Sequence, residues 1–112
     1  MNADEAEVPI RSRDYWFKVT SFLQENWALV DVEPDGAIVW FLNKGSGVID
    51  RLRFRSEAEA TRGLRHNGFQ RFADDPEAPR YVRPPAPPFL GAWAKGASYA
   101  GGIYSSGKYW TR

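Results

Sequence analysis

Three β-rich runs separated by two turn signals occupy the middle of this sequence and constrain its fold more than any other feature. The runs are 27–33, 37–42 and 48–55, and the turns between them are 34–36 and 43–47. The first turn contains Asp-Gly, a strong hairpin signal, because glycine accepts a positive φ without steric cost. The pattern predicts an antiparallel meander of three strands.

Residues 14–26 precede this meander and carry apolar side chains at helical spacing. Asp14 suits the N-terminus of a helix, because acidic side chains there favour the helix dipole. We therefore predict a helix over 14–26. The aromatic residues Tyr15 and Phe17 fill the other phase of the pattern, so a short strand at the start of the segment remains an alternative.

A second helix is predicted to follow the meander. Ser56 offers a hydroxyl cap, and acidic residues at 57 and 59 lie in the first turn. Asn67-Gly68 marks the end of this helix, because glycine can adopt the left-handed cap conformation. Residues 69–72 then predict a short strand. The expected fold is α+β, an antiparallel sheet of three to five strands with two helices on one face.

The whole chain, 1–112, is expected to form a single domain, because this length supports one core. Residues 1–10 predict a mobile acidic tail. Residues 84–112 form an irregular segment rich in proline, glycine and aromatic residues. We expect this segment to pack on the core, because many large apolar side chains are costly to leave in water.

The composition excludes several kinds of chemistry. The sequence has no cysteine and one histidine, which excludes disulfides, thiol catalysis and metal sites built from thiolates or several imidazoles. No phosphate-binding glycine loop is present. We therefore expect no catalytic residues, no metal and no cofactor. His66, at the end of the second predicted helix, is more typical of a structural or solvated residue, and an enzyme built around it is the least favoured alternative.

The charge of the chain is unevenly placed. Residues 1–50 contain nine acidic and four basic residues, whereas 51–112 contain five acidic and eleven basic residues, for a net charge of +1. Such asymmetry is typical of a partner surface, although the two halves can also neutralise each other within one fold. No apolar run is long enough to cross a membrane, and the absence of cysteine fits a cytoplasmic location.

An acidic face is the first candidate binding surface. Strand alternation places Asp31 and Glu33 on one face, and the following turn presents them on a rigid element. Arginines two strands away, at roughly 10 Å, would neutralise these acids only in part. Solvated acids at a strand end are the alternative. The predicted partner-binding residues are Asp31, Glu33, Asp35 and Trp40.

The cover of the middle strand, 37–42, decides whether this surface is open. The strand is apolar on both faces, so helices must cover one face, and either the C-terminal segment or a partner must cover the other. A two-residue Asp35-Gly36 loop would place Trp40 beside the acids, whereas a three-residue loop would reverse the register.

A basic strand is the second candidate. Arg51, Arg53 and Arg55 alternate along one run and would project from one face roughly 6.5–7 Å apart, which resembles the spacing of successive phosphates. They predict, as an alternative function, a small nucleic-acid-binding module. The charge of +1 is more typical of the wet face of a sheet than of a dedicated nucleic-acid binder.

Three stretches of the sequence resemble small bacterial immunity proteins of contact-dependent inhibition and related polymorphic toxin systems. They are Asp14-Tyr15-Trp16-Phe17, the segment from Phe54 through Ser56 and Glu59-Ala60 to Asn67-Gly68-Phe69, and 103–110. The resemblance implies a cytoplasmic, non-catalytic inhibitor that binds one cognate toxin domain and blocks its active site. Many such toxins are nucleases, for which an acidic inhibitor surface mimics the nucleic acid; the net charge of +1 departs from that pattern.

Overall fold

The computed structural model describes residues 7–21 and 24–91. These residues form an α+β fold with a six-stranded mixed sheet in the order β5-β1-β2-β3-β4-β6. The strands are β1 (Tyr15–Ser21), β2 (Gln24–Glu33), β3 (Gly36–Leu42), β4 (Gly47–Phe54), β5 (Gln70–Arg71) and β6 (Leu90–Gly91). The remaining elements of the described chain are the helix α1 (Glu57–His66) and the short 3₁₀ segments η2 (Phe72–Asp74) and η3 (Ala78–Arg80).

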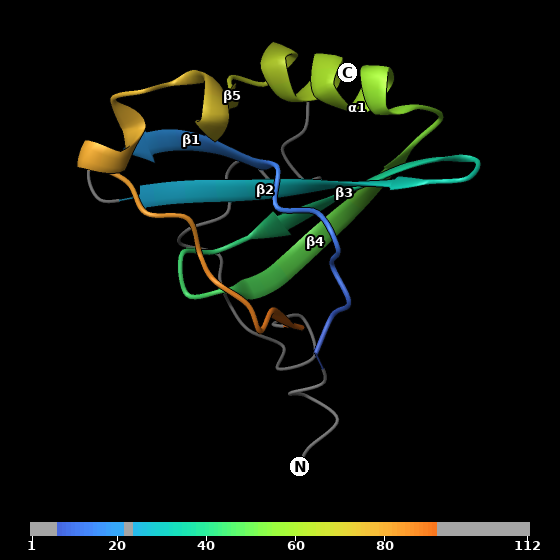
Figure 1. The fold of residues 1–112 in the computed structure, drawn as a ribbon, viewed down its shortest axis with the longest axis horizontal. Helices are drawn as coiled ribbons and strands as arrows, with labels where there is room; N and C mark the ends of the chain where they lie inside the picture. The colour runs from blue at the N-terminus through green and yellow to red at the C-terminus, as the bar shows by residue number, and fades with distance from the viewer. Residues whose placement is uncertain (1–6, 22–23, 92–112) are drawn as a thin grey trace.

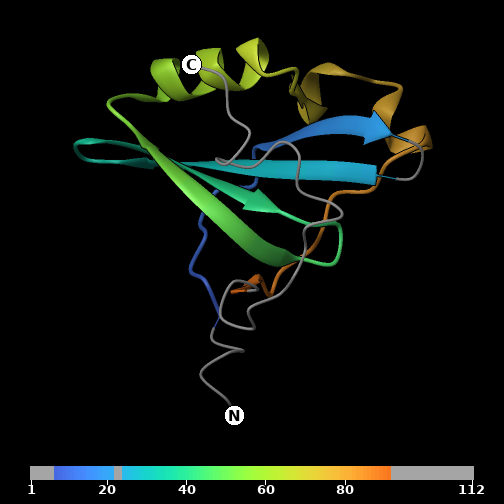
Figure 2. The same ribbon diagram turned by 180° about the vertical axis from the view of Figure 1, so that it is seen from behind.

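The two faces of the sheet have different covers. Figure 1 shows α1 along one side of the sheet, while the N-terminal segment and the segment that leads to β6 run along the other. The view from behind shows the same two sides and the β2–β3 hairpin reaching beyond the end of β1 (Figure 2). All neighbouring strands pair antiparallel except β4 and β6, which are parallel. The expected antiparallel sheet is therefore mixed and larger than predicted.

The predicted helix over 14–26 is wrong, because β1 and the start of β2 occupy this stretch. Trp16 and Phe17 are adjacent and both fully buried, but they belong to cores on opposite sides of the sheet. A helix would turn only one stripe of the segment inward, whereas a strand in a sheet covered on both faces buries both phases of the pattern. The described chain thus has one α-helix on the sheet where two were expected.

The predicted hairpin is present, but its glycine has a different role. Glu33 pairs with Gly36, so the turn residues are Pro34 and Asp35. Gly36 is the first residue of β3, and a Cβ there would collide with the carbonyl oxygen of Phe54 on β4. The glycine is therefore required by the close approach of the neighbouring strand and not by a positive φ.

The helix predicted after Ser56 is confirmed, together with both of its ends. The Ser56 hydroxyl accepts a hydrogen bond from the Glu59 amide at 3.0 Å. At the other end Gly68 has a φ of 87°, and the Phe69 amide donates to the Leu64 carbonyl at 2.9 Å. This is the Schellman arrangement that satisfies the last carbonyls of a helix.

The core on the α1 side of the sheet is held by one apolar stripe of the helix. Ala60 and Leu64 are fully buried against β2 and β3. The buried residues of this core are Trp16, Ala28, Val30, Ala37, Val39, Phe41, Ala60, Leu64 and Phe69.

The core on the other side is covered by irregular chain. Its buried members are Val8, Ile10, Phe17, Trp27, Leu29, Leu42, Val48, Ala78, Val82 and Phe89. The Val8 amide donates to the Phe89 carbonyl at 2.7 Å, so the N-terminal segment and the segment before β6 also hold each other. The expectation of a mobile tail over 1–10 is therefore wrong for residues 7–10.

Polar side chains fix this irregular cover to the sheet. The Tyr15 hydroxyl donates to the Pro85 carbonyl, and the Ser46 hydroxyl donates to the Ala86 carbonyl at 2.6 Å. Phe89 is then buried against the sheet. Phe89 is the member of segment 84–112 that the described residues place in the core, and residues 92–112 of the segment lie outside the described residues.

Candidate functional site: an arginine face

Asp31, expected to project from the sheet toward a partner, is buried with only 5% of its surface exposed. Its carboxylate accepts hydrogen bonds from the amides of Arg11 at 3.1 Å and Ser12 at 2.8 Å. Hydrogen bonds from backbone amides to a carboxylate are among the stronger ones in proteins. Asp31 therefore fastens the N-terminal segment across β2, and its assignment to the binding surface is corrected.

Glu33 and Asp35 lie near the tip of the β2–β3 hairpin, where Asp35 is exposed in the turn. An Arg53 guanidinium nitrogen lies 3.5 Å from a Glu33 carboxylate oxygen. A separation of roughly 10 Å was expected between these acids and the arginines of the third predicted strand. Arg53 and Glu33 are much closer than that. The predicted acidic face does not form, because one acid is buried and another is paired.

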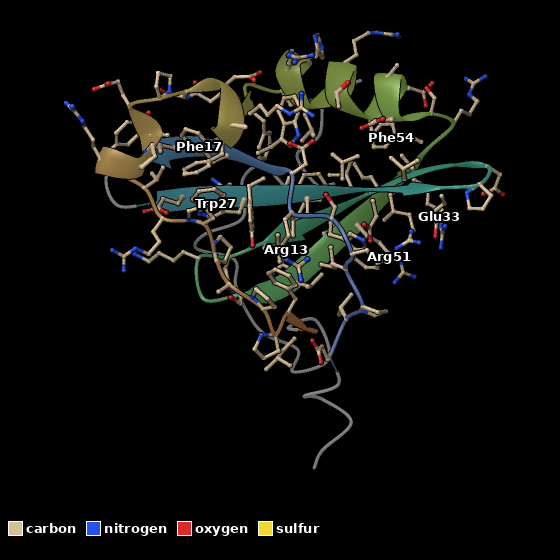
Figure 3. The ribbon with its side chains drawn as sticks, viewed as in Figure 1. Arg13, Phe17, Trp27, Glu33, Arg51 and Phe54 are labelled. Atoms are coloured by element: carbon tan, nitrogen blue, oxygen red, sulfur yellow. The ribbon has the colours of Figure 1, made fainter. Side chains whose placement is uncertain are left out.

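Four arginines gather on the side of the sheet away from α1. Arg51 and Arg53 belong to β4, where they pair with Trp40 and Ile38 of β3. Ile38 pairs in turn with Asp31, whose carboxylate holds the backbone of the N-terminal segment. Figure 3 shows Arg13, Arg51 and Glu33 on this same side. We call the surface formed by Arg11, Arg13, Arg51, Arg53 and Trp40 the arginine face.

The guanidinium groups of the arginine face are positioned by neighbouring groups. Arg51 lies over the Trp40 ring with its guanidinium carbon 6.0 Å from the centroid, and Arg13 lies over the Phe89 ring at 5.2 Å. Arg11 donates to the Val32 carbonyl at 3.0 Å. Cation–π contact and carbonyl hydrogen bonds orient these groups without removing their charge. The face therefore presents positive charge, with Glu33 as its ion-paired acidic neighbour.

Trp40, also assigned to the partner surface, is half-buried beneath Arg51. Its indole nitrogen is buried and, within the described part of the chain, has no hydrogen-bond partner. Trp40 thus forms the aromatic floor beneath Arg51.

The third arginine of the predicted nucleic-acid-binding set, Arg55, is separated from the other two. It follows the end of β4, and its guanidinium lies 3.7 Å from the carboxylate of Glu59 at the start of α1. The same carboxylate accepts a hydrogen bond from the Arg55 amide at 3.0 Å. Arg51 and Arg53 project from one face of β4, as expected. Arg55 instead contacts Glu59 in the first turn of α1.

Residues suited to metal binding are not brought together in the described chain. His66 is exposed in the last turn of α1. No group of three or more histidine, cysteine, aspartate or glutamate side chains among the described residues could hold a metal ion. Nor does any helix of residues 7–21 and 24–91 have the length and apolar character required to cross a membrane.

Arg11 and Arg13 were not expected from the sequence as site residues. The expected mobile tail ended just before them, and nothing in their local pattern indicated that Asp31 would hold this segment on the sheet. The usable signal was Asp31 itself, an acid within the apolar run 27–32. A buried carboxylate needs donors, and backbone amides of another segment supply them here.

Comparison with known proteins gives this chain no relative. No protein-family model, no curated protein and no solved structure matches it.

Proposed function

We propose that this chain is a non-catalytic protein-binding protein, and that its arginine face is the surface that meets the partner. The observation that carries the proposal is that Arg11 and Arg13, on the segment held by Asp31, lie on the same side of the sheet as Arg51 and Arg53, with Trp40 half-buried beneath Arg51. Arginine and tryptophan are enriched at the energetic centres of protein interfaces. An aromatic floor with arginines held above it combines both features.

The charge of this face defines the chemistry of the partner. Exposed arginines speed the approach of an acidic surface and select against a basic one. We therefore propose an acidic partner surface, the opposite of the basic cleft that an acidic inhibitor would mask. The immunity-protein resemblance supplies the partner class: a secreted toxin domain, neutralised in the cytoplasm when this chain covers its active site.

Growth rescue tests this proposal. The protein encoded by the reading frame beside the gene of this chain, as the candidate toxin, is expressed in a bacterial host with and without the chain. We expect the wild-type chain to restore growth and Arg51→Glu to abolish the rescue, while Arg62→Glu on the exposed side of α1 leaves it intact. Failure of the wild-type chain to restore growth would refute the toxin assignment, and equal rescue by both variants would refute the arginine face.

Nucleic-acid binding is the second candidate, favoured by one observation. Arg51 and Arg53 project from the same face of β4 at the spacing of alternate strand residues, about 6.5–7 Å. A salt titration with a single-stranded oligonucleotide tests this candidate. Phosphate contacts make affinity fall steeply with salt, so a steep loss that disappears in the Arg51→Gln, Arg53→Gln double variant would favour nucleic acid over protein.

A further inference from the structure

A second cationic region lies beyond the arginine face, in a surface pocket of about 590 Å³. The chain from η3 to the proline-rich segment forms most of its wall, and the β3–β4 turn contributes Lys44. Its lining residues are Glu25, Lys44, Pro79, Arg80, Tyr81, Val82, Arg83, Pro84, Pro85 and Ala86. The volume falls within the range of about 300–1,000 Å³ that is usual for small-molecule sites.

The charges of this pocket are not balanced by its own acid. Arg80 is ion-paired with Glu77 at 3.1 Å, and Glu25 accepts a hydrogen bond from the Trp27 indole at 3.1 Å. For Lys44 and Arg83, the described residues provide neither a hydrogen bond nor an ion pair within 4.0 Å. The pocket therefore offers positive charge to an anion.

Tyr81 gives the same pocket an exposed aromatic ring. The residue is 56% exposed, one of the few large apolar side chains of the described chain with more than half of its surface in solvent. Its hydroxyl donates to the Asp75 carboxylate at 2.9 Å, and its ring contacts Phe17 edge-on with centroids 6.3 Å apart. The hydrogen bond to Asp75 raises the pKa of Tyr81 above its usual value. The ring is thus held in place with much of its surface uncovered.

We propose that this pocket binds a nucleotide unit, with the base stacked on Tyr81 and the phosphate held by Lys44 and Arg83. Both halves of the ligand follow from the lining: an exposed ring accepts a planar aromatic group, and cations that have no ion-pair partner among the described residues accept a phosphate. A free mononucleotide and a nucleotide within a single strand share this chemistry. The assignment is independent of the proposed protein partner, because it uses none of the residues of the arginine face.

Calorimetric titration of the full chain with adenosine monophosphate, inorganic phosphate and a short single-stranded oligothymidylate tests the proposal. We expect the nucleotide to bind more tightly than phosphate alone. Tyr81→Leu should weaken nucleotide binding by about 5- to 150-fold, because stacking is lost, while Tyr81→Phe retains the ring and most of the affinity. Arg83→Gln should also weaken binding and make it less sensitive to salt.

Arg62 is an exposed arginine on α1, on the other side of the sheet. The Arg62→Gln variant is therefore the matched control and should bind the nucleotide as the wild type does. Tighter binding of the oligothymidylate than of the mononucleotide would identify a single strand as the source of the ligand. Tighter binding of the mononucleotide would identify a free nucleotide as the source. Both results support the proposed nucleotide site in this pocket. The proposal is overturned if adenosine monophosphate fails to bind at millimolar concentration, if phosphate binds equally tightly, or if Tyr81→Leu and Arg83→Gln match the wild type.

Discussion

The two faces of the sheet bury comparable sets of apolar residues under covers of different kinds. On one face α1 packs Ala60 and Leu64 into the core, and the backbone hydrogen bonds of the helix are satisfied by the helix itself. On the other face two irregular segments pack Val8, Ile10 and Phe89 into the core. Their backbone groups need partners from elsewhere, because a buried loop cannot satisfy them alone.

Polar side chains of β1, β2 and the β3–β4 turn supply these partners. Asp31 accepts two amides of the N-terminal segment, while Tyr15 and Ser46 donate to carbonyls of the segment before β6. A helix is a self-contained cover, whereas irregular chain is a cover only when specific side chains hold it. The same anchors also place Arg11 and Arg13 on the side of the sheet that carries Arg51 and Arg53, so the cover of this face and its proposed binding function depend on the same contacts.

The largest expected effect comes from removing the main apolar contact of the irregular cover. Phe89→Ala should lower the free energy of unfolding by about 3–5 kcal/mol, through lost burial and the cavity left behind. Leu64→Ala on the α1 face is the matched comparison, with an expected loss of about 2–5 kcal/mol. Urea unfolding measures both. A loss below about 1 kcal/mol for Phe89→Ala would show that the irregular segment is not part of the core.

Removing an anchor should come next. Asp31→Ala leaves two amides without their acceptor, and we expect a loss of about 2–3 kcal/mol in unfolding free energy. Asp35→Ala, four residues further along in the exposed turn, is the control and should change stability by less than about 0.5 kcal/mol. Amide hydrogen exchange should also quicken at Arg11 and Ser12 in Asp31→Ala. Unchanged exchange there would contradict the anchoring role.

The helical cover should respond more weakly to the loss of its cap. Ser56→Ala removes the hydroxyl that accepts the Glu59 amide, and we expect a loss of about 1 kcal/mol. Thermal unfolding followed by circular dichroism measures this change. A loss as large as that of Asp31→Ala would remove the distinction between a self-contained and an anchored cover.

The smallest effect concerns pH. Burial raises the pKa of Tyr15 above its usual value, although the charge of Arg13 opposes the shift. The neutral Tyr15 hydroxyl therefore contributes fully to the free energy of unfolding below about pH 10, the pKa of tyrosine in the unfolded chain. This contribution is lost as the pH rises through the higher pKa of Tyr15 in the folded state. We expect wild-type protein to lose stability relative to Tyr15→Phe above about pH 10. Parallel stability curves for the two proteins across this range would contradict the burial of the hydroxyl.

Local patterns in the sequence were sufficient for the elements that stabilise themselves. Ser56, Asn67-Gly68 and the stripe between them predicted α1 and both of its ends, because capping and amphipathic spacing are local properties. The β2–β3 hairpin was also predicted, but its register was left open between a two-residue and a three-residue loop. The observed Pro34-Asp35 turn places Trp40 on the same face as Asp31 and Glu33.

The elements that depend on distant partners were not predictable in this way. The apolar spacing over 14–26 matched a helix, and only burial on both faces of the sheet makes β1 the better solution for Trp16 and Phe17. The role of Asp31 depends on amides some twenty residues away in the chain. Gly36 is required by a neighbouring strand and not by its own turn. In each case the deciding contact is not recorded in the local pattern.

The arginine face is tested most directly by the rate at which this chain associates with the proposed partner, the protein encoded beside its gene, measured by stopped-flow fluorescence at several salt concentrations. We expect Arg51→Glu to slow association by about tenfold or more at low salt, and the difference to shrink as salt screens the charges. Arg62→Glu should associate at the wild-type rate. Equal association rates for wild-type, Arg51→Glu and Arg62→Glu proteins, each shown to be folded, would contradict the account.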